Sequence, residues 1–379
     1  MTTVAQKIPP AAPGLPEPMA PFADVRRIAV LRGGGLGDLV FALPAILALR
    51  DTYPEAALTL LGSAAHRVLL AGRGIVDAVE ILPPVPGVGP GAGRSDSSDA
   101  AETAAFTARA SRAAYDLGVQ IHGGGANSNP FLLGLGVRHS VGTKTPDAEH
   151  LERTIPYEYY QHEVLRALEV VGLAGASAPA SQPLLPVSVE ERATATLLLG
   201  HRGGAPLVVL HPGASDPRRR WPASRFGEVA DRLVASGARV VVVGDASDRS
   251  IADEVVEGVS PERSAGIRSL AGRLGLAELL GVLAEAELFV GNDSGPRHLA
   301  EAVGTRTASV FWYGNVITAG PLGRSSHRVA MSHRTTCPTC LRDITQVGWT
   351  AERCGHDDSV VADVGVAEVA AMASALLSD

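Results

Sequence analysis

Cysteine is scarce in this sequence, and its scarcity excludes a protein held together by several disulfides. Three cysteines in 379 residues cannot form a framework of paired disulfides, so free thiols or a metal site are expected. Apolar runs long enough to cross a bilayer are also missing. The first two dozen residues lack the apolar core of a signal peptide. We therefore expect a cytoplasmic protein without a transmembrane segment, for which peripheral membrane contact stays open.

An excess of positive charge is absent as well. The net charge of -7 and the isoelectric point near 5.9 argue against a general affinity for nucleic acid. A hydrophobic content of 46% with 19% charged residues is typical of a globular chain that buries a core. The length of 379 residues predicts two domains, or about three at most.

The order of short apolar runs and helical segments predicts an α/β protein. Alternating strands and helices of these lengths form parallel sheets covered on both faces. Two such halves predict two Rossmann-like domains facing a central cleft. Strands are expected near 26–31, 58–61, 79–82 and 117–121, and again near 207–210, 239–243, 288–290 and 307–311.

Proline-rich and small-residue stretches divide the chain. Residues 1–24 hold six prolines and predict a disordered tail. The first domain is expected over 25–172, a linker over 173–188 and the second domain over 189–360. We expect a final helix within 361–379 to pack on the first domain.

A glycine turn with an acid is the first candidate site. Arg32 and three glycines follow an apolar strand, and Asp38 then lies in the first turn of a helix. Asp38 is either an acid favoured by the helix dipole or a general base. The dinucleotide pattern fails, because Asp38 and Leu39 occupy the place of its last glycine in the two possible registers. No Gly-Lys pair completes a P-loop.

Two turns in the second half suit a phosphate. His211-Pro212-Gly213-Ala214-Ser215 follows a strand and leads to three arginines at 218–220. The segment 291–298, GNDSGPRH, follows another strand and opens a helix whose amides favour a diphosphate. A solvated basic loop and simple helix caps are the alternative interpretations. Together the two turns favour a nucleotide-diphosphate site.

These motifs resemble glycosyltransferase family 9, the ADP-heptose:lipopolysaccharide heptosyltransferase type with the GT-B fold. The resemblance covers most of 26–325 and rests on the Gly-Leu-Gly-Asp turn, HPGAS…RWP, Val-Gly-Asp at 243–245 and GNDSGPRHLAEAVG. It implies that Asp38 is the catalytic base and that no metal is needed for catalysis. The donor-binding residues that it implies are Ser215, Arg219, Asp248, Asp293, Ser294, Gly295 and His298.

Further residues are candidates for the acceptor side and for a metal. His122 and Asn127 are either acceptor contacts or loop caps, and Gly35 and Gly37 belong to the turn beside Asp38. A C-x2-C pair is followed by C-x-H, a ligand set that suits structural zinc. Reduced structural cysteines explain the pattern equally well. The four candidate ligands are Cys337, Cys340, Cys354 and His356.

The sequence thus predicts an inverting glycosyltransferase. It is expected to move a sugar, heptose by resemblance, from an ADP-activated donor to a glycan or small-molecule hydroxyl. A nucleotide-sugar epimerase or hydrolase of the same fold is one alternative. A non-catalytic protein that binds a sugar nucleotide or a metal is the other.

Overall fold

The computed structural model describes residues 14–89, 97–178, 180–200, 203–347 and 350–378. The chain divides into two compact units, Met1–Pro183 and Leu184–Asp379. The boundary lies within the stretch 173–188, where the sequence predicts a linker. In the described part of the chain no helix is both long enough and apolar enough to span a bilayer.

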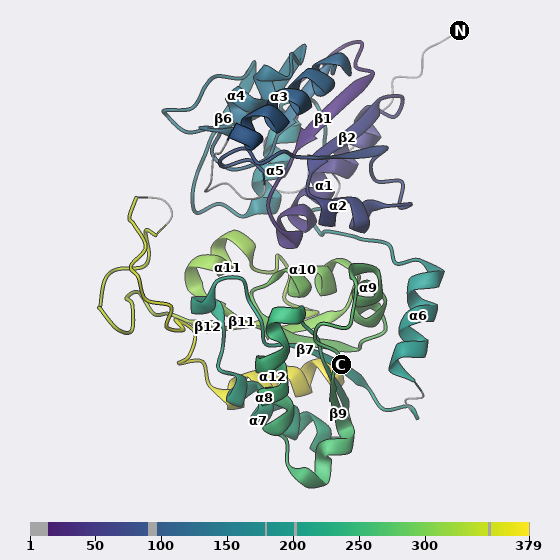
Figure 1. Cartoon of the computed structure of the whole chain (residues 1–379), viewed down its shortest axis with the longest axis vertical. Helices are drawn as coiled ribbons and strands as arrows, with labels where there is room; N and C mark the ends of the chain where they lie inside the picture. The colour runs from purple at the N-terminus through teal and green to yellow at the C-terminus, as the bar shows by residue number, and fades with distance from the viewer. Residues whose placement is uncertain (1–13, 90–96, 179, 201–202, 348–349, 379) are drawn as a thin grey trace. The chain divides into compact units, whose positions relative to one another are not determined.

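The first unit is built on a six-stranded parallel sheet (Figure 1). Its strand order is β3-β2-β1-β4-β5-β6. The strands are β1 Arg27–Leu31, β2 Ala57–Gly62, β3 Ala78–Ile81, β4 Leu117–Gln120, β5 His139–Lys144 and β6 Arg153–Pro156. The helices are α1 Leu36–Thr52, α2 Ala64–Leu70, α3 Ser97–Arg112, α4 Ser128–Gly134 and α5 Glu163–Gly172.

The second unit repeats this topology. Its parallel sheet has the order β12-β11-β10-β7-β8-β9. The strands are β7 Leu207–His211, β8 Arg239–Val242, β9 Ile267–Ser269, β10 Leu288–Asn292, β11 Arg306–Trp312 and β12 His327–Ser332. The helices are α6 Val189–Leu199, α7 Ala223–Ala235, α8 Arg249–Glu257, α9 Leu276–Ala284, α10 Gly295–Ala302, α11 Tyr313–Ala319 and α12 Val366–Ser378. In Figure 1, α9, α10 and α11 lie on one side of this sheet and α7, α8 and α12 on the other.

The strands form because their side chains are buried on both sides of the sheet. The central strands β1 and β7 carry continuous apolar runs, and helices cover both faces of such parallel sheets. Both sheets have the order of a doubly wound fold, in which the chain reverses direction between its first and fourth strands. Ligands bind at this switch point, beyond the carboxyl ends of the strands. The predicted class, two parallel α/β domains, is confirmed.

The expected disordered tail is wrong for the part that the structure describes. Residues 1–13 lie outside the described residues, but residues 14–24 pack on the first unit. Phe22 is buried and stacks on His139, with ring centroids 4.2 Å apart. The amide of Met19 donates to the carbonyl of Gly172 at 2.9 Å. Buried aromatic area and backbone pairing thus hold a segment whose proline content predicts disorder.

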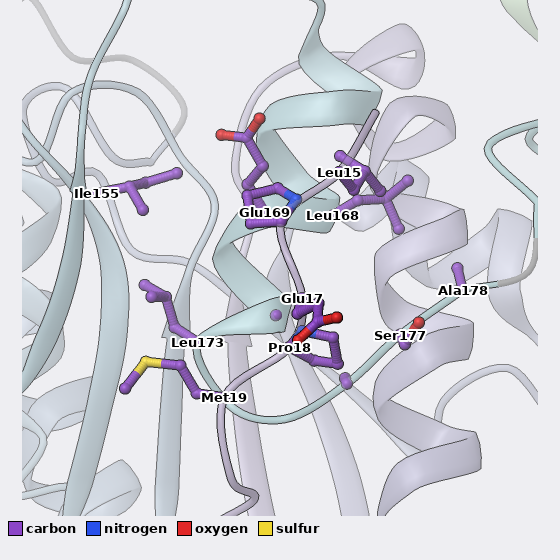
Figure 2. Close-up of a pocket in the computed structure, with 13 residues that line it drawn as sticks. Leu15, Glu17, Pro18, Met19, Ile155, Leu168, Glu169, Leu173, Ser177 and Ala178 are labelled. Carbon is purple, nitrogen blue, oxygen red and sulfur yellow. The ribbon is translucent and has the colours of Figure 1, made fainter. Parts of the chain in front are cut away.

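The ordered N-terminal segment runs beside α5 and closes a pocket with it (Figure 2). The pocket measures about 140 Å³ and is lined by Leu15 to Met19, by Leu168 and Glu169 of α5, and by Ile155 of β6. None of the candidate site residues lines it. It is therefore a packing feature at the edge of the first unit and not part of the site described below.

The final helix is also placed differently from the expectation. We expected it to pack on the first domain, but α12 packs against α7 and β11 of the second unit. Val369, Ala373 and Leu376 are buried in that unit's own core. The apolar face of α12 completes the cover of the second sheet, which is why the helix belongs to the second unit.

Candidate functional site

The turn between β1 and α1 holds Asp38 in a defined position. Gly35 is the N-cap of α1, and its amide donates to Oδ2 of Asp38 at 2.8 Å. Gly34 has a φ of +88°, and a Cβ there would lie 2.5 Å from the same oxygen. Only glycine therefore fits beside this carboxylate. The side chain of Asp38 remains 45% exposed, so the carboxylate is both a helix cap and open to solvent.

Arg32 fixes the other carboxylate oxygen. Its Nη2 lies 2.8 Å from Oδ1 of Asp38 and 3.1 Å from Oε2 of Glu163, at the start of α5. Its Nη1 donates to the carbonyl of Ile121 at 2.5 Å. Burial opposes the charge of the guanidinium, but Asp38 and Glu163 outweigh it and raise the pKa of Arg32. A permanently charged arginine thus orients Asp38, whose remaining lone pairs can accept a proton.

Two histidines of the first unit lie near this turn. Nδ1 of His66 accepts from the amide of Ser63 at 3.2 Å, so Nε2 carries the proton and donates to the carbonyl of Gly35 at 3.1 Å. Nε2 of His122 lies 2.9 Å from the carbonyl of Gly87. Burial lowers the pKa of both histidines, which favours neutral rings near pH 7.

The other acceptor-side candidates lie at the same edge of the sheet. His122 follows β4, which pairs directly with β1, so it lies at the switch point with the Asp38 turn. Asn127 is exposed and abuts Gly87, whose carbonyl is the partner of His122. Gly37 is the second residue of α1. His122 and Asn127 therefore both contact the loop that contains Gly87.

In the second unit Arg219 joins the two switch-point loops. These loops follow β7 and β10, which pair side by side. Nη1 of Arg219 lies 3.0 Å from Oδ2 of Asp293, and its Nη2 donates to Oγ of Ser215 at 3.0 Å. The Arg219 side chain is 29% exposed, whereas that of Asp293 is 3% exposed. The guanidinium is thus accessible, and its buried partner holds it in place.

Asp293 and His298 form the buried support for Arg219. Nε2 of His298 lies 3.2 Å from Oδ1 of Asp293, and Nδ2 of Asn315 donates to Oδ2 at 2.5 Å. Arg297 Nη1 donates to Nδ1 of His298 at 3.0 Å, so this histidine is neutral with its proton on Nε2. Burial raises the pKa of Asp293, but this effect is outweighed by His298, Arg219 and Asn315. Together they hold the pKa well below its usual range. Both ring nitrogens of His298 are thus engaged within the protein.

His211 connects Asp248 to the start of α10. Its Nε2 lies 3.5 Å from Oδ2 of Asp248, and its Nδ1 lies 3.1 Å from Oγ of Ser294. The amide of Asp245 donates to the same Oδ2 at 3.2 Å. The hydrogen bond from His211 lowers the pKa of Asp248, which is buried. A Cβ on Gly213 would lie 2.5 Å from Oδ1 of Asp248, so this glycine allows the loops to pack.

The amino end of α10 offers an anion-binding group. Ser294 is the N-cap, and its carbonyl accepts from the amides of Arg297 and His298. Across the described residues the amide of Gly295 makes no hydrogen bond with the protein. It lies at the positive end of the helix, where a phosphate oxygen is favoured. The amide of Gly295 and the guanidinium of Arg219 therefore retain capacity for a ligand.

Several of these residues were given no role of their own from the sequence. Arg32 directly precedes the glycine turn, and His211 ends a strand, so their positions were a usable signal. His66, Glu163 and Asn315 have no such signal in the sequence, because only the fold brings them to the site.

The cysteine segment of the second unit forms a metal-binding constellation. The ligand atoms of Cys337, Cys340, Cys354 and His356 all lie within 4.8 Å of one another. Tetrahedral ligands of zinc lie roughly 3.3–3.8 Å apart, so a small contraction closes the site. Nδ1 of His356 is buried with no hydrogen-bond partner among the described residues. Backbone amides at Cys340 lower the pKa of Cys337 to about 7, which favours the thiolate that a metal needs. These residues fit a metal ion.

The topology and the loops define a two-domain α/β protein of the GT-B class with a phosphate-suited site in its second unit. A sequence model of "Glycosyltransferase family 9 (heptosyltransferase)" matches residues 107–347, more than half of the chain. The chain belongs to this family. The resemblance identified from the sequence is therefore confirmed, and with it the enzyme class at the level of the family.

One curated relative and two solved structures are similar to this chain. Lipopolysaccharide heptosyltransferase 2 of Salmonella typhimurium is 32% identical over 126 residues, which cover 33% of this chain and only 36% of the relative's length. The structure of the Escherichia coli ADP-heptose LPS heptosyltransferase II aligns with a TM-score of 0.68 at 19% identity, covering 93% of this chain and 98% of the other. TibC, an iron-containing dodecameric glycosyltransferase from enterotoxigenic E. coli, aligns with a TM-score of 0.56 at 14% identity, covering 95% and 80%.

Proposed function

We propose that this protein is an inverting glycosyltransferase that moves heptose from an ADP-activated donor to a hydroxyl acceptor. The observation that carries the proposal is the geometry of Asp38. Its exposed carboxylate is held by the amide of Gly35 and the guanidinium of Arg32 at the switch point of the first unit. Family membership supports heptose as the sugar, and a relative described as an ADP-heptose transferase supports the nucleotide.

Asp38 acts as the general base in this proposal. A sugar hydroxyl is a poor nucleophile near neutral pH, so a positioned carboxylate removes its proton as the oxygen attacks the anomeric carbon. The bond from that carbon to the diphosphate oxygen breaks, and ADP leaves with the electron pair. Because attack comes opposite the leaving group, the anomeric centre is inverted. His122 and Asn127, with Gly35 and Gly37, are assigned to the acceptor side.

The second unit binds the donor diphosphate. Arg219, Ser215 and the amide of Gly295 stabilise the negative charge that develops on the leaving group. Asp293 and His298 act through Arg219, since their polar atoms are bound within the protein. Two remaining assignments stay predictions: Asp248 near the donor ribose, and Ser294 at the turn that faces the diphosphate and the sugar.

A structural zinc ion in the cysteine segment is part of the proposal. Three thiolates and the unpartnered Nδ1 of His356 would hold it. When bound, zinc would supply a cross-link between the Cys337–Cys340 pair and the Cys354–His356 pair of the same segment, and the transfer reaction is assigned to protein groups. Reduced thiols at such a site are kept in a reducing compartment, which supports the cytoplasm as the location.

Replacement of the base tests the function. Asp38→Asn keeps an oxygen for the Gly35 amide, so the helix cap and the fold are retained. ADP release from ADP-heptose, with truncated lipopolysaccharide as acceptor, should fall by about a hundredfold or more in kcat. The affinity for ADP, measured by calorimetry, should stay at the parent value.

The matched control is Asp51→Asn, which changes an exposed acid near the other end of the same helix. It should leave both quantities unchanged. Parent-like turnover of Asp38→Asn would overturn the assignment of the base.

A further inference from the structure

The metal-binding segment has almost no core of its own. Between Pro338 and Ser359, Ile344 is the only buried residue among those that the structure describes. Figure 1 shows the segment as a long yellow-green excursion between β12 and α12. Its two ends are tied by a hydrogen bond from Oγ1 of Thr339 to Oδ2 of Asp358, at 2.6 Å. A segment with so little buried surface depends on cross-links for its conformation. A metal ion bound by its four candidate ligands would be the strongest of these cross-links.

This segment contacts the loop that carries the donor-binding arginine. Arg353 directly precedes the ligand Cys354, and its Nη2 lies 3.8 Å from Oδ1 of Asp216. Arg353 also pairs with Asp357, which directly follows the ligand His356. One arginine thus links the residues flanking two metal ligands to Asp216.

Asp216 organises the donor-binding loop from within. Its Oδ2 lies 2.6 Å from Nη2 of Arg218, and its Oδ1 accepts from the Arg218 amide at 3.0 Å. These bonds shape the short helix Pro217–Arg219. Asp216 adjoins Ser215 in sequence and Arg218 adjoins Arg219, so the position of Asp216 fixes both phosphate-binding side chains.

A backbone contact closes the connection. The amide of Val360 donates to the carbonyl of Arg218 at 2.8 Å. Val360 is buried and ends the metal-binding segment. The donor-binding loop is therefore held by the segment at two points, one a backbone hydrogen bond and the other an ion pair.

We propose that a metal ion bound by Cys337, Cys340, Cys354 and His356 positions the donor-binding loop 215–220 through Arg353 and Asp216. Loss of the metal loosens the segment, frees Asp216 from Arg353 and lowers the affinity for the nucleotide diphosphate. Arg353 and Asp216 are positioning residues, since neither is assigned a contact with the donor. The inference rests on the proposed zinc site and the proposed donor site.

Binding of ADP to the full-length protein tests this coupling. Calorimetric titrations with ADP are made on the metal-loaded parent, on the parent after chelation, and on Arg353→Ala, with metal content measured for each. We expect Arg353→Ala to keep its metal. Its affinity for ADP should fall by at most about threefold, because one partly exposed ion pair contributes little. Chelation, which loosens the whole segment, should weaken ADP binding by about tenfold or more. The matched control is Arg342→Ala, an exposed arginine of the same segment with no side-chain ion pair among the described residues; it should bind as the parent does.

The outcomes separate the coupling from the proposals beneath it. Purified protein with well under one metal equivalent overturns the metal site and the coupling together. A parent that binds metal but not ADP overturns the donor site. A third outcome is that the parent binds both metal and ADP. If the chelated protein and Arg353→Ala then bind ADP as tightly as the metal-loaded parent, the coupling alone is overturned.

Discussion

Asp38 serves as a helix cap and as the proposed base, and the first role makes the second one possible. Capping of the Gly35 amide fixes one oxygen, and Arg32 fixes the other. A base that must meet a reacting hydroxyl gains from such fixed geometry, because a small misplacement costs rate. Gly34 is essential to it, since any larger residue would press on the carboxylate.

Gly34→Ala tests this dependence. Alanine at a φ of +88° is strained, and its Cβ would displace the Asp38 carboxylate. We expect kcat to fall by about tenfold or more at unchanged ADP affinity, measured by ADP release and calorimetry. Gly72→Ala is the control, because Gly72 has a φ of +69° with no atom within 4 Å of its Cβ position. Equal kcat in the two variants would contradict the role of Gly34.

A second prediction for a single residue concerns Asp293, whose lowered pKa should make the stability of the protein depend on pH. Its pKa is lowered in the folded protein, so its contribution is complete above the pKa of an unfolded aspartate and is lost as pH falls. Asp293→Asn should lower the free energy of unfolding by about 3 kcal/mol near pH 7, because Arg219 loses its buried partner. That difference should shrink below about pH 4, measured by denaturant titration.

An exposed aspartate provides the control for this prediction. Asp253→Asn changes a solvent-exposed acid of α8 and should leave stability within about 0.5 kcal/mol of the parent at each pH. A parent-to-Asp293→Asn difference that is constant from pH 7 to pH 3 would contradict the ion-pair assignment.

At the scale of elements, parallel pairing decides which loops meet. β4 pairs with β1 and β10 pairs with β7, although about 80 residues separate the strands in each pair. This pairing places His122 at the Asp38 turn and Asp293 at the Arg219 loop. The last helix, α12, then covers the second sheet, and its Leu376 carbonyl accepts from Nη1 of Arg306 at 2.7 Å.

Truncation of a buried α12 side chain measures this packing. Leu376→Ala removes a fully buried side chain from the second core and should lower the free energy of unfolding by about 2–4 kcal/mol. Leu377→Ala, one residue on and only partly buried, should cost less than half as much by the same denaturant titration. Equal losses would contradict the observed orientation of the helix.

At the scale of the molecule, each unit has its own sheet and its own core. The proposed base belongs to the first unit and the proposed donor site to the second. A nucleotide that binds one unit stabilises that unit directly, by an amount set by its concentration relative to Kd.

Calorimetric unfolding with ADP tests this division. At about one hundred times its Kd, ADP should add about 2.7 kcal/mol to the stability of the second unit. The melting transition of that unit is identified by its shift in Leu376→Ala. A shift of the other transition alone would contradict the assignment of the donor site.

The fold class and the two switch-point turns could be predicted because both depend on local patterns. Apolar runs followed by Gly, Asp or Ser mark where strands end and helices begin. Strands such as β5 and β12 were not predicted, since HSVGTK and HRVAMS mix polar and apolar residues. They are strands because neighbouring strands supply their hydrogen bonds, and no local pattern records that.

The sequence by itself determined the parallel α/β class and the family, and it singled out Asp38, Arg219 and the four metal-ligand candidates, whose roles remain proposals. Local spacing carries this information, because turn chemistry and ligand sets depend on neighbours in the chain. Only the tertiary structure decided that Phe22 anchors the N-terminal segment, that α12 belongs to the second unit and that Arg32 holds Asp38. These depend on burial and charge pairing between residues far apart in sequence, which become neighbours only when the sheets form.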